Sequence, residues 1–178
     1  MANGWSHARI NVVAATGILA AGHSYGWSPQ DLMVLGFGCA VSTLFLSPDI
    51  DLKQSISSRS WGIFRFLWIP YHRVFRHRGL SHWPIIGTLS RIVYLFVFFE
   101  ILSYGYFAAA AYLEHWDALR AVQASTDQVY LHKQNLIAFA RENHRYLLVF
   151  FYGLALTDGI HTLVDWLSSF WKRLVVKS

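Results

Sequence analysis

The chain has 178 residues, of which 54% are hydrophobic and only 14% are charged, and its formal net charge is +5. So few charges argue against an ordinary soluble enzyme, since soluble domains carry roughly 25% charged residues, and the apolar content excludes a disordered or collagen-like chain. The single cysteine, Cys39, excludes an internal disulfide and a thiolate zinc cluster, and the positive charge favours an anionic partner such as lipid head groups or phosphate esters.

Four apolar stretches predict an all-α helical bundle, embedded in or associated with a membrane, that forms a single domain over residues 1–178. The stretches run over about 9–22, 32–46, 84–113 and from 136 or 146 to 171. The third is long enough to cross ~30 Å of hydrocarbon, whereas the first two are short for a full span. The fourth is interrupted by Asp158, His161 and Asp165, which cannot face lipid and must face protein, metal or a wet cavity.

The first candidate site residues flank the first two stretches. His7 stands at the start of the first, and Ser47-Pro48-Asp49-Ile50-Asp51 follows the second. Two carboxylates two residues apart suit metal ligation, with Asp49 or Asp51 bridging metals or acting as the general base. The alternative is ordinary turn chemistry, which Ser-Pro-Asp also satisfies.

Residues 47–81 form a basic-aromatic segment that contains no acid after Asp51. Its aromatic residues alternate with its cations, which predicts an interfacial loop with rings at head-group depth and cations on phosphates. The rings are Trp61, Phe64, Phe66, Trp68, Tyr71 and Phe75, and the cations are Lys53, Arg59, Arg65, Arg73, Arg76 and Arg78.

This segment ends in His77-Arg78-Gly79-Leu80-Ser81-His82, directly before the third apolar stretch. The spacing suits a loop that wraps a metal site, with Arg78 clamping a phosphate. The alternative is a basic loop that contacts only lipid head groups.

Two further features belong to the middle of the chain. Arg91 and Glu100 within the third stretch are interpreted as structural or cavity-lining residues that pair with neighbours or with the fourth helix. Residues 114–145 read as a polar insertion of one or two amphipathic helices outside the bilayer. This insertion and the helix at 84–113 are candidate surfaces for a protein partner.

The sharpest motif is Asp158-Gly-Ile-His161-Thr-Leu-Val-Asp165. On a helix, positions i and i+4 share one face, so His161 and Asp165 point together, and Asp158 lies one turn before. An imidazole and carboxylates at this spacing suit a zinc-like ion. The alternative is a polar packing cluster paired to arginines.

The order of the elements places these motifs on one side. If the four stretches are antiparallel neighbours, one side gathers His7, Asp49, Asp51, His77, His82, Asp158, His161 and Asp165. The same side carries ten of the cations against four on the other side. The positive-inside rule therefore predicts a cytoplasmic, or stromal, metal site.

The residues also resemble known families. An N-terminal His, "PDIDL", "HRGLSH" and "HTLVD" resemble the membrane-bound metal-dependent hydrolase (YdjM-like) family, and the string from Ser47 to Thr88 looks closer to metal-binding proteins common in cyanobacteria. These families are distantly similar to zinc-dependent phospholipase C and the single-strand nucleases of that fold. The resemblance implies a divalent metal, zinc above all, with one to three ions held by His and Asp.

The favoured function is metal-dependent hydrolysis of a phosphoester, with a lipid-like substrate and membrane lipids as partners. His82, His161 and Asp165 would hold a first ion and His7 and His77 a second, while Arg78 would hold the phosphate. The alternative is a non-catalytic membrane subunit or assembly factor with a structural metal. No specific nucleic acid is expected.

Overall fold

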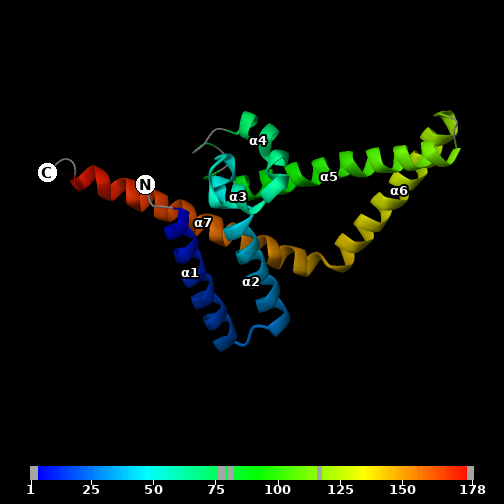
Figure 1. Cartoon of the computed structure of the whole chain (residues 1–178). Helices are drawn as coiled ribbons and strands as arrows, with labels where there is room; N and C mark the ends of the chain where they lie inside the picture. Colours follow the sequence, from blue (N-terminus) through cyan, green and yellow to red (C-terminus); the bar gives the residue numbers. More distant parts are fainter. Residues whose placement is uncertain (1–3, 76–78, 80–81, 116–117, 176–178) are drawn as a thin grey trace. The chain divides into compact units, whose positions relative to one another are not determined.

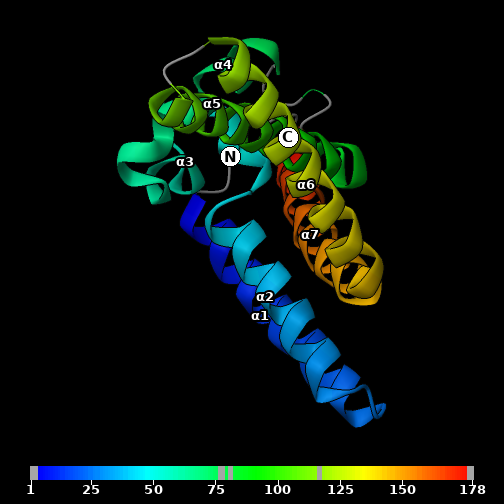
Figure 2. The same cartoon turned by 90° about the vertical axis from the view of Figure 1, so that its right-hand side faces the viewer.

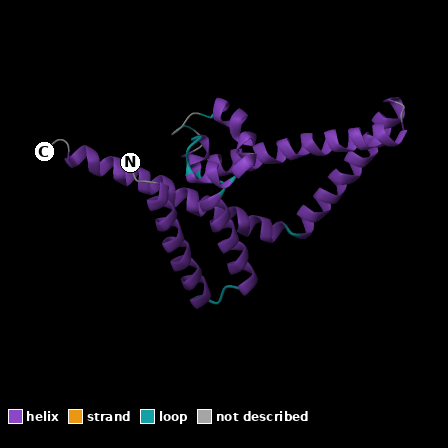
Figure 3. Cartoon of the chain, in the orientation of Figure 1, coloured by secondary structure: helices purple, strands orange, loops and turns teal. Residues whose placement is uncertain are grey.

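A computed structural model describes residues 4–75, 79, 82–115 and 118–175, and these described residues contain helices and loops but no strand (Figures 1 and 3). The elements are α1 (Gly4–Ser24), α2 (Pro29–Leu44), the 3₁₀ helix η1 (Pro48–Asp51), α3 (Ile56–Ser60), the 3₁₀ helix η2 (Gly62–Trp68), α4 (Ile69–Val74), α5 (Pro84–His115), α6 (Ala118–Glu142) and α7 (His144–Val175). The all-α prediction is confirmed. The chain divides into two compact units, 1–91 with 148–178, and 92–147.

Within the described residues, three helical segments are long and apolar enough to cross a membrane, judged by length and composition. They are Pro29–Asp51, Pro84–Leu113 and His144–Val175, so α1 is not among them. The second stretch looked short in the sequence, but α2 continues closely into η1, which lengthens the segment to 23 residues. In the most apolar window of Pro84–Leu113 only 17% of the residues are buried, and large apolar side chains such as Phe96 and Ile101 are exposed.

In the first unit, α1 and α2 form an antiparallel hairpin (Figures 1 and 2). Gly26 has a φ of 77°, a left-handed conformation that favours glycine, and turns the chain between the two helices. Ser28 then caps α2 by accepting a hydrogen bond from the Asp31 N–H at 3.1 Å. The hairpin brings the start of α1 back to the end of α2, as the antiparallel order predicted for His7 and Asp49.

Helices α2 and α7 cross at two glycines. A Cβ atom on Gly153 would lie 2.4 Å from the Leu35 carbonyl oxygen, and one on Gly38 would lie 2.4 Å from the Phe150 carbonyl oxygen. No side chain fits at either position, because the two backbones are in direct contact. The crossing fixes α7 against α2 one helical turn before Asp158.

The basic-aromatic segment folds into four short helices, and it is not uniformly interfacial. Trp68 and Tyr71 are completely buried, while Ile63 is 81% exposed. Trp68 packs edge-on against Tyr71 with ring centroids 5.4 Å apart, and the Tyr71 hydroxyl pairs with Ser90 of α5. Trp68 and Tyr71 therefore form the segment's own core and cannot contact head groups directly, whereas the depth of the segment in a membrane stays a prediction.

The second unit contains the later part of α5 and all of α6. Ala111, Ala121 and Ser125 are buried, and Glu100 lies 3.6 Å from His132 of α6. The insertion predicted at 114–145 thus contains one long helix, α6, whose His132 faces the acid within the apolar α5.

Replacing Gly153 by Ala should lower the free energy of unfolding by about 1–3 kcal/mol, because the new methyl group collides with backbone atoms that cannot move aside. Gly17 is the matched control: it lies within α1, and a Cβ there meets no atom within 4 Å. Gly17→Ala should stabilise the helix slightly. Thermal unfolding in detergent, followed by circular dichroism, measures both; equal melting of the two variants would contradict the tight crossing.

Candidate metal centre

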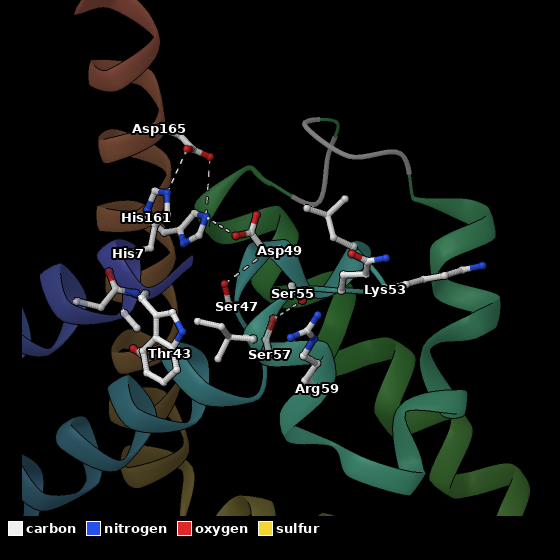
Figure 4. A pocket seen from close by; sticks show the side chains of 16 residues that line it. His7, Thr43, Ser47, Asp49, Lys53, Ser55, Ser57, Arg59, His161 and Asp165 are labelled. Atoms are coloured by element: carbon white, nitrogen blue, oxygen red, sulfur yellow. Dashed lines mark hydrogen bonds and ion pairs between the residues drawn. The ribbon is translucent and has the colours of Figure 1, made fainter. Parts of the chain in front are cut away.

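Local structure at the end of α2 presents Asp49 and Asp51. Ser47 caps η1 by accepting a hydrogen bond from the Asp49 N–H at 3.4 Å, and Pro48 occupies the first turn. Ser-Pro-Asp therefore does form a helix start, and the same turn directs Asp49 toward the other site residues (Figure 4). The motif therefore both begins the helix η1 and presents a carboxylate to the candidate metal site.

Helices α1 and α7 contribute the next three side chains. His161 and Asp165 lie on one face of α7, and His7 of α1 packs over them. The His7 and His161 rings stack with centroids 4.1 Å apart, and His7 Nε2 lies 3.2 Å from Asp165 Oδ1. Figure 4 shows His7, His161, Asp49 and Asp165 pointing toward one another.

His82 completes the group from the residue pair that precedes α5. Its backbone carbonyl accepts a hydrogen bond from Thr162 Oγ1 at 2.8 Å, which ties it to α7. Its Nε2 faces Asp49 at 3.6 Å, while its Nδ1 faces Asp51 at 3.8 Å. This is the arrangement in which an outer carboxylate orients a ligating histidine.

One ligand atom from each of Asp49, His82, His161 and Asp165 lies within 4.8 Å of the others. His161 Nε2 is 3.5 Å from Asp49 Oδ2 and 3.8 Å from Asp165 Oδ2. These separations exceed a good hydrogen bond, whereas two ligands of one tetrahedral zinc, with bonds of about 2.0–2.1 Å, lie ~3.3 Å apart. The spacing thus fits side chains that share an ion.

The hydrogen bonding and the protonation of the histidines also support a metal site. His161 Nε2 and His7 Nδ1 are buried and have no hydrogen-bond partner within the described parts of the chain. An unpaired buried nitrogen is costly unless something else binds it. Burial, together with the neighbouring His161, lowers the pKa of His7, which favours the neutral imidazole that a metal requires.

A cavity of about 570 Å³ opens beside the cluster. His7, Asp49, His161 and Asp165 line one part of it, so the cluster is accessible from this space. A site open to a cavity leaves room for a further ligand, which is typical of catalytic metal sites and not of closed structural ones.

Asp158, predicted as a metal ligand, has other partners. Its carboxylate is buried and accepts hydrogen bonds from Ser42 of α2 and from Thr88 and Arg91 of α5. It is thus already paired and stands outside the group of four. Here the arrangement matches the alternative of polar packing to an arginine, and it also gives Arg91 the partner in the fourth apolar helix that the sequence suggested.

His77 and Arg78 lie outside the described residues, so their predicted roles remain predictions. Sequence reasoning missed Thr162, although it stands inside the "HTLVD" motif, and it missed Asn11. Asn11 lies one turn after His7 on the same face of α1, is 3% exposed and lines the cavity. The spacing of four from His7 was the signal that could have revealed it.

Over residues 2–175 the chain matches the family described as "Uncharacterized metal-binding protein (DUF2227)". The chain belongs to this family. A relative from Aquifex aeolicus (strain VF5), described as "Uncharacterized protein", is 46% identical over 68 residues, which is 38% of this chain and 48% of the relative. The chain thus matches about half the length of that relative. No solved structure matches the chain. The family and the His/Asp cluster together support a metal site.

The purified protein should contain a divalent metal, and His161→Ala and Asp165→Asn should lose most of it, because each removes one ligand and Asn lacks the charge that offsets the ion. His23→Ala is the control, since His23 is an exposed histidine at the far end of α1. Metal content by mass spectrometry and melting with and without a chelator measure the effect. Metal-free wild-type protein whose melting ignores the chelator would refute the site.

Proposed function

We propose that this protein is a membrane-associated, metal-dependent phosphoester hydrolase that acts on a lipid-like substrate. The observation that supports it most is the cavity of about 570 Å³, which gives access to the His/Asp cluster. The resemblance of the motifs to membrane-bound metal-dependent hydrolases and to zinc-dependent phospholipase C favours the same chemistry.

In this proposal His82, His161 and Asp165 would hold a zinc-type ion whose fourth position stays open to the cavity, and His7, which lies beside Asp165, would help to hold a second ion. Such an ion lowers the pKa of bound water to ~7 and polarises a phosphoryl oxygen. Asp49 lines the cavity, and in this proposal it would accept a proton from the attacking water or, alternatively, bridge two ions. Asp51, whose side chain is fully buried behind His82, orients that imidazole instead.

A lipid-like substrate fits the surroundings of the site. Next to the cavity, the segment from Ile56 to Val74 exposes Ile63, Phe64 and Phe66 beside exposed Arg65 and Arg73. Apolar side chains among cations suit the boundary between hydrocarbon and head groups. A phosphoester in a head group would lie at the same depth as the cluster.

The second candidate, a non-catalytic membrane subunit with a structural metal, predicts a closed set of protein ligands. The adjoining cavity favours the hydrolase. The long exposed α5 and the helix α6 remain the surfaces through which a protein partner would bind in either case.

Detergent-solubilised protein should hydrolyse p-nitrophenyl phosphate or its diester, or dispersed phospholipid, and lose this activity on chelation. Asp49→Asn should lower kcat at least about 10²-fold, the usual contribution of a general base, whereas His23→Ala should leave it unchanged. A metal-loaded wild-type protein inactive on all three substrates would favour the structural role.

We further propose that the cluster faces the cytoplasm, or the stroma in a thylakoid, on the evidence of the cation asymmetry. Ser60 at the end of α3 and Ser24 at the end of α1 are exposed and lie at opposite ends of the Pro29–Asp51 segment. In intact cells an impermeant thiol reagent should label Ser24→Cys and spare Ser60→Cys until the membrane is permeabilised. The reverse pattern would invert the orientation.

A further inference from the structure

We propose that Arg59, with the hydroxyls of Ser55 and Ser57, forms an anion-binding wall of the cavity that receives the phosphate group of the substrate. This inference rests on the proposed function, because it assigns the recognition of that substrate's phosphate. Sequence reasoning gave this role to Arg78, which lies outside the described residues. Arg59 is a different residue, on α3.

Arg59 is an exposed cation near the end of α3. The sequence has no acid between Asp51 and Glu100, and Arg59 makes no ion pair among the residues that the structure describes. It lines the same cavity as Asp49, His161 and Asp165. Figure 4 shows its guanidinium turned toward Ser55 and Ser57, with the carboxylates across the cavity, whereas Lys53 extends away. A planar guanidinium suits the bidentate binding of phosphate oxygens.

The two serines supply a hydroxyl donor beside that guanidinium. Ser55 Oγ accepts a hydrogen bond from the Ser58 N–H at 3.1 Å, and it lies 3.1 Å from Ser57 Oγ. The pair has two hydroxyl hydrogens and uses one of them between its own oxygens. The other hydrogen is available to a ligand, and Ser57, only 2% exposed, is held in a fixed position for this purpose.

Asn11 gives independent evidence that the cavity receives a polar ligand. Its side chain is 3% exposed and lines the cavity, yet its Oδ1 has no hydrogen-bond partner in the described chain. A buried amide oxygen without a donor is costly, and a ligand hydroxyl or an ordered water would satisfy it. The cavity therefore offers carboxylates and imidazoles on one side, and a guanidinium and hydroxyl on the other.

This distribution selects a substrate by charge. Asp49 and Asp165 alone would repel an anion, whereas a metal held at the cluster and Arg59 would together offset that repulsion. The recognised group is a phosphoryl group, carried either by a lipid head group or by a small soluble ester.

The test compares Arg59→Gln with Arg65→Gln. Both are exposed arginines of the same basic segment and lose the same charge, but Arg65 does not line the cavity. Inorganic phosphate is titrated into the metal-loaded, full-length protein in detergent by calorimetry. Arg59→Gln should weaken binding about tenfold with unchanged metal content and melting temperature, and Arg65→Gln should stay within about twofold. Arg59→Lys should recover part of the affinity.

Two additional ligands identify the source of the phosphate. If Arg59→Gln weakens binding of both glycerol phosphate and micellar phosphatidic acid, the phosphoryl group itself is recognised. If it weakens binding of phosphatidic acid alone, the ligand is a lipid head group. Equal phosphate binding by wild type and both variants, with the metal present, would refute the anion-binding wall. It would not affect the proposed hydrolase function. A wild-type protein without metal would instead overturn the proposed function, whatever the phosphate titration gives.

Discussion

The structure depends on how one apolar helix accommodates three ionisable side chains. Asp158, His161 and Asp165 lie within two turns of α7, and each is costly in an apolar setting unless another element compensates it. Arg91 of α5 pairs with Asp158, while His7 of α1 and Asp49 of η1 lie against the other two. Removing one member of such a buried pair typically costs about 3–5 kcal/mol. The polar residues of α7 therefore fix it against α1, α2 and α5.

The residues of the His/Asp cluster could be predicted from the sequence. The sequence could not show which carboxylate of α7 pairs with Arg91 and which one joins the cluster. Topological order brought His7, Asp49 and His82 to one end, because antiparallel helices return their ends to the same place. At about 100° and 1.5 Å per residue, however, Asp158 and Asp165 lie on the same flank of His161, only ~20° apart around α7, but they are separated by ~10 Å along its axis. The two carboxylates thus meet different neighbours. Which one meets Arg91 depends on how α5 packs, and spacing along one helix carries no information about that.

The basic-aromatic segment shows a second limit. Its composition is that of an interfacial loop, and Ile63, Phe64 and Arg65 are indeed exposed. Trp68 and Tyr71 differ from them in position: the Tyr71 hydroxyl lies 3.0 Å from Ser90 of α5, and the neighbouring His72 Nε2 lies 2.7 Å from the Ile50 carbonyl oxygen of η1. In the same segment, Arg59 differs from Arg65 by lining the cavity. Short 3₁₀ and α turns give no long periodicity from which a buried face could be predicted, so only tertiary contacts separate these residues.

Each of the three apolar segments has a site residue at or near one of its ends, or about one membrane thickness from its start. Asp49 stands at the end of Pro29–Asp51, and His82 stands just before Pro84–Leu113. From His144 to Asp165 is 22 residues of α7, or ~33 Å, close to the ~30 Å of a hydrocarbon core. If these segments cross a membrane, Asp49, His82 and Asp165 each stand near one end of a crossing along the chain. Charged side chains near the end of a crossing lie close to water and avoid the apolar centre of the bilayer, and in the proposed function a head-group phosphate would lie at the same depth.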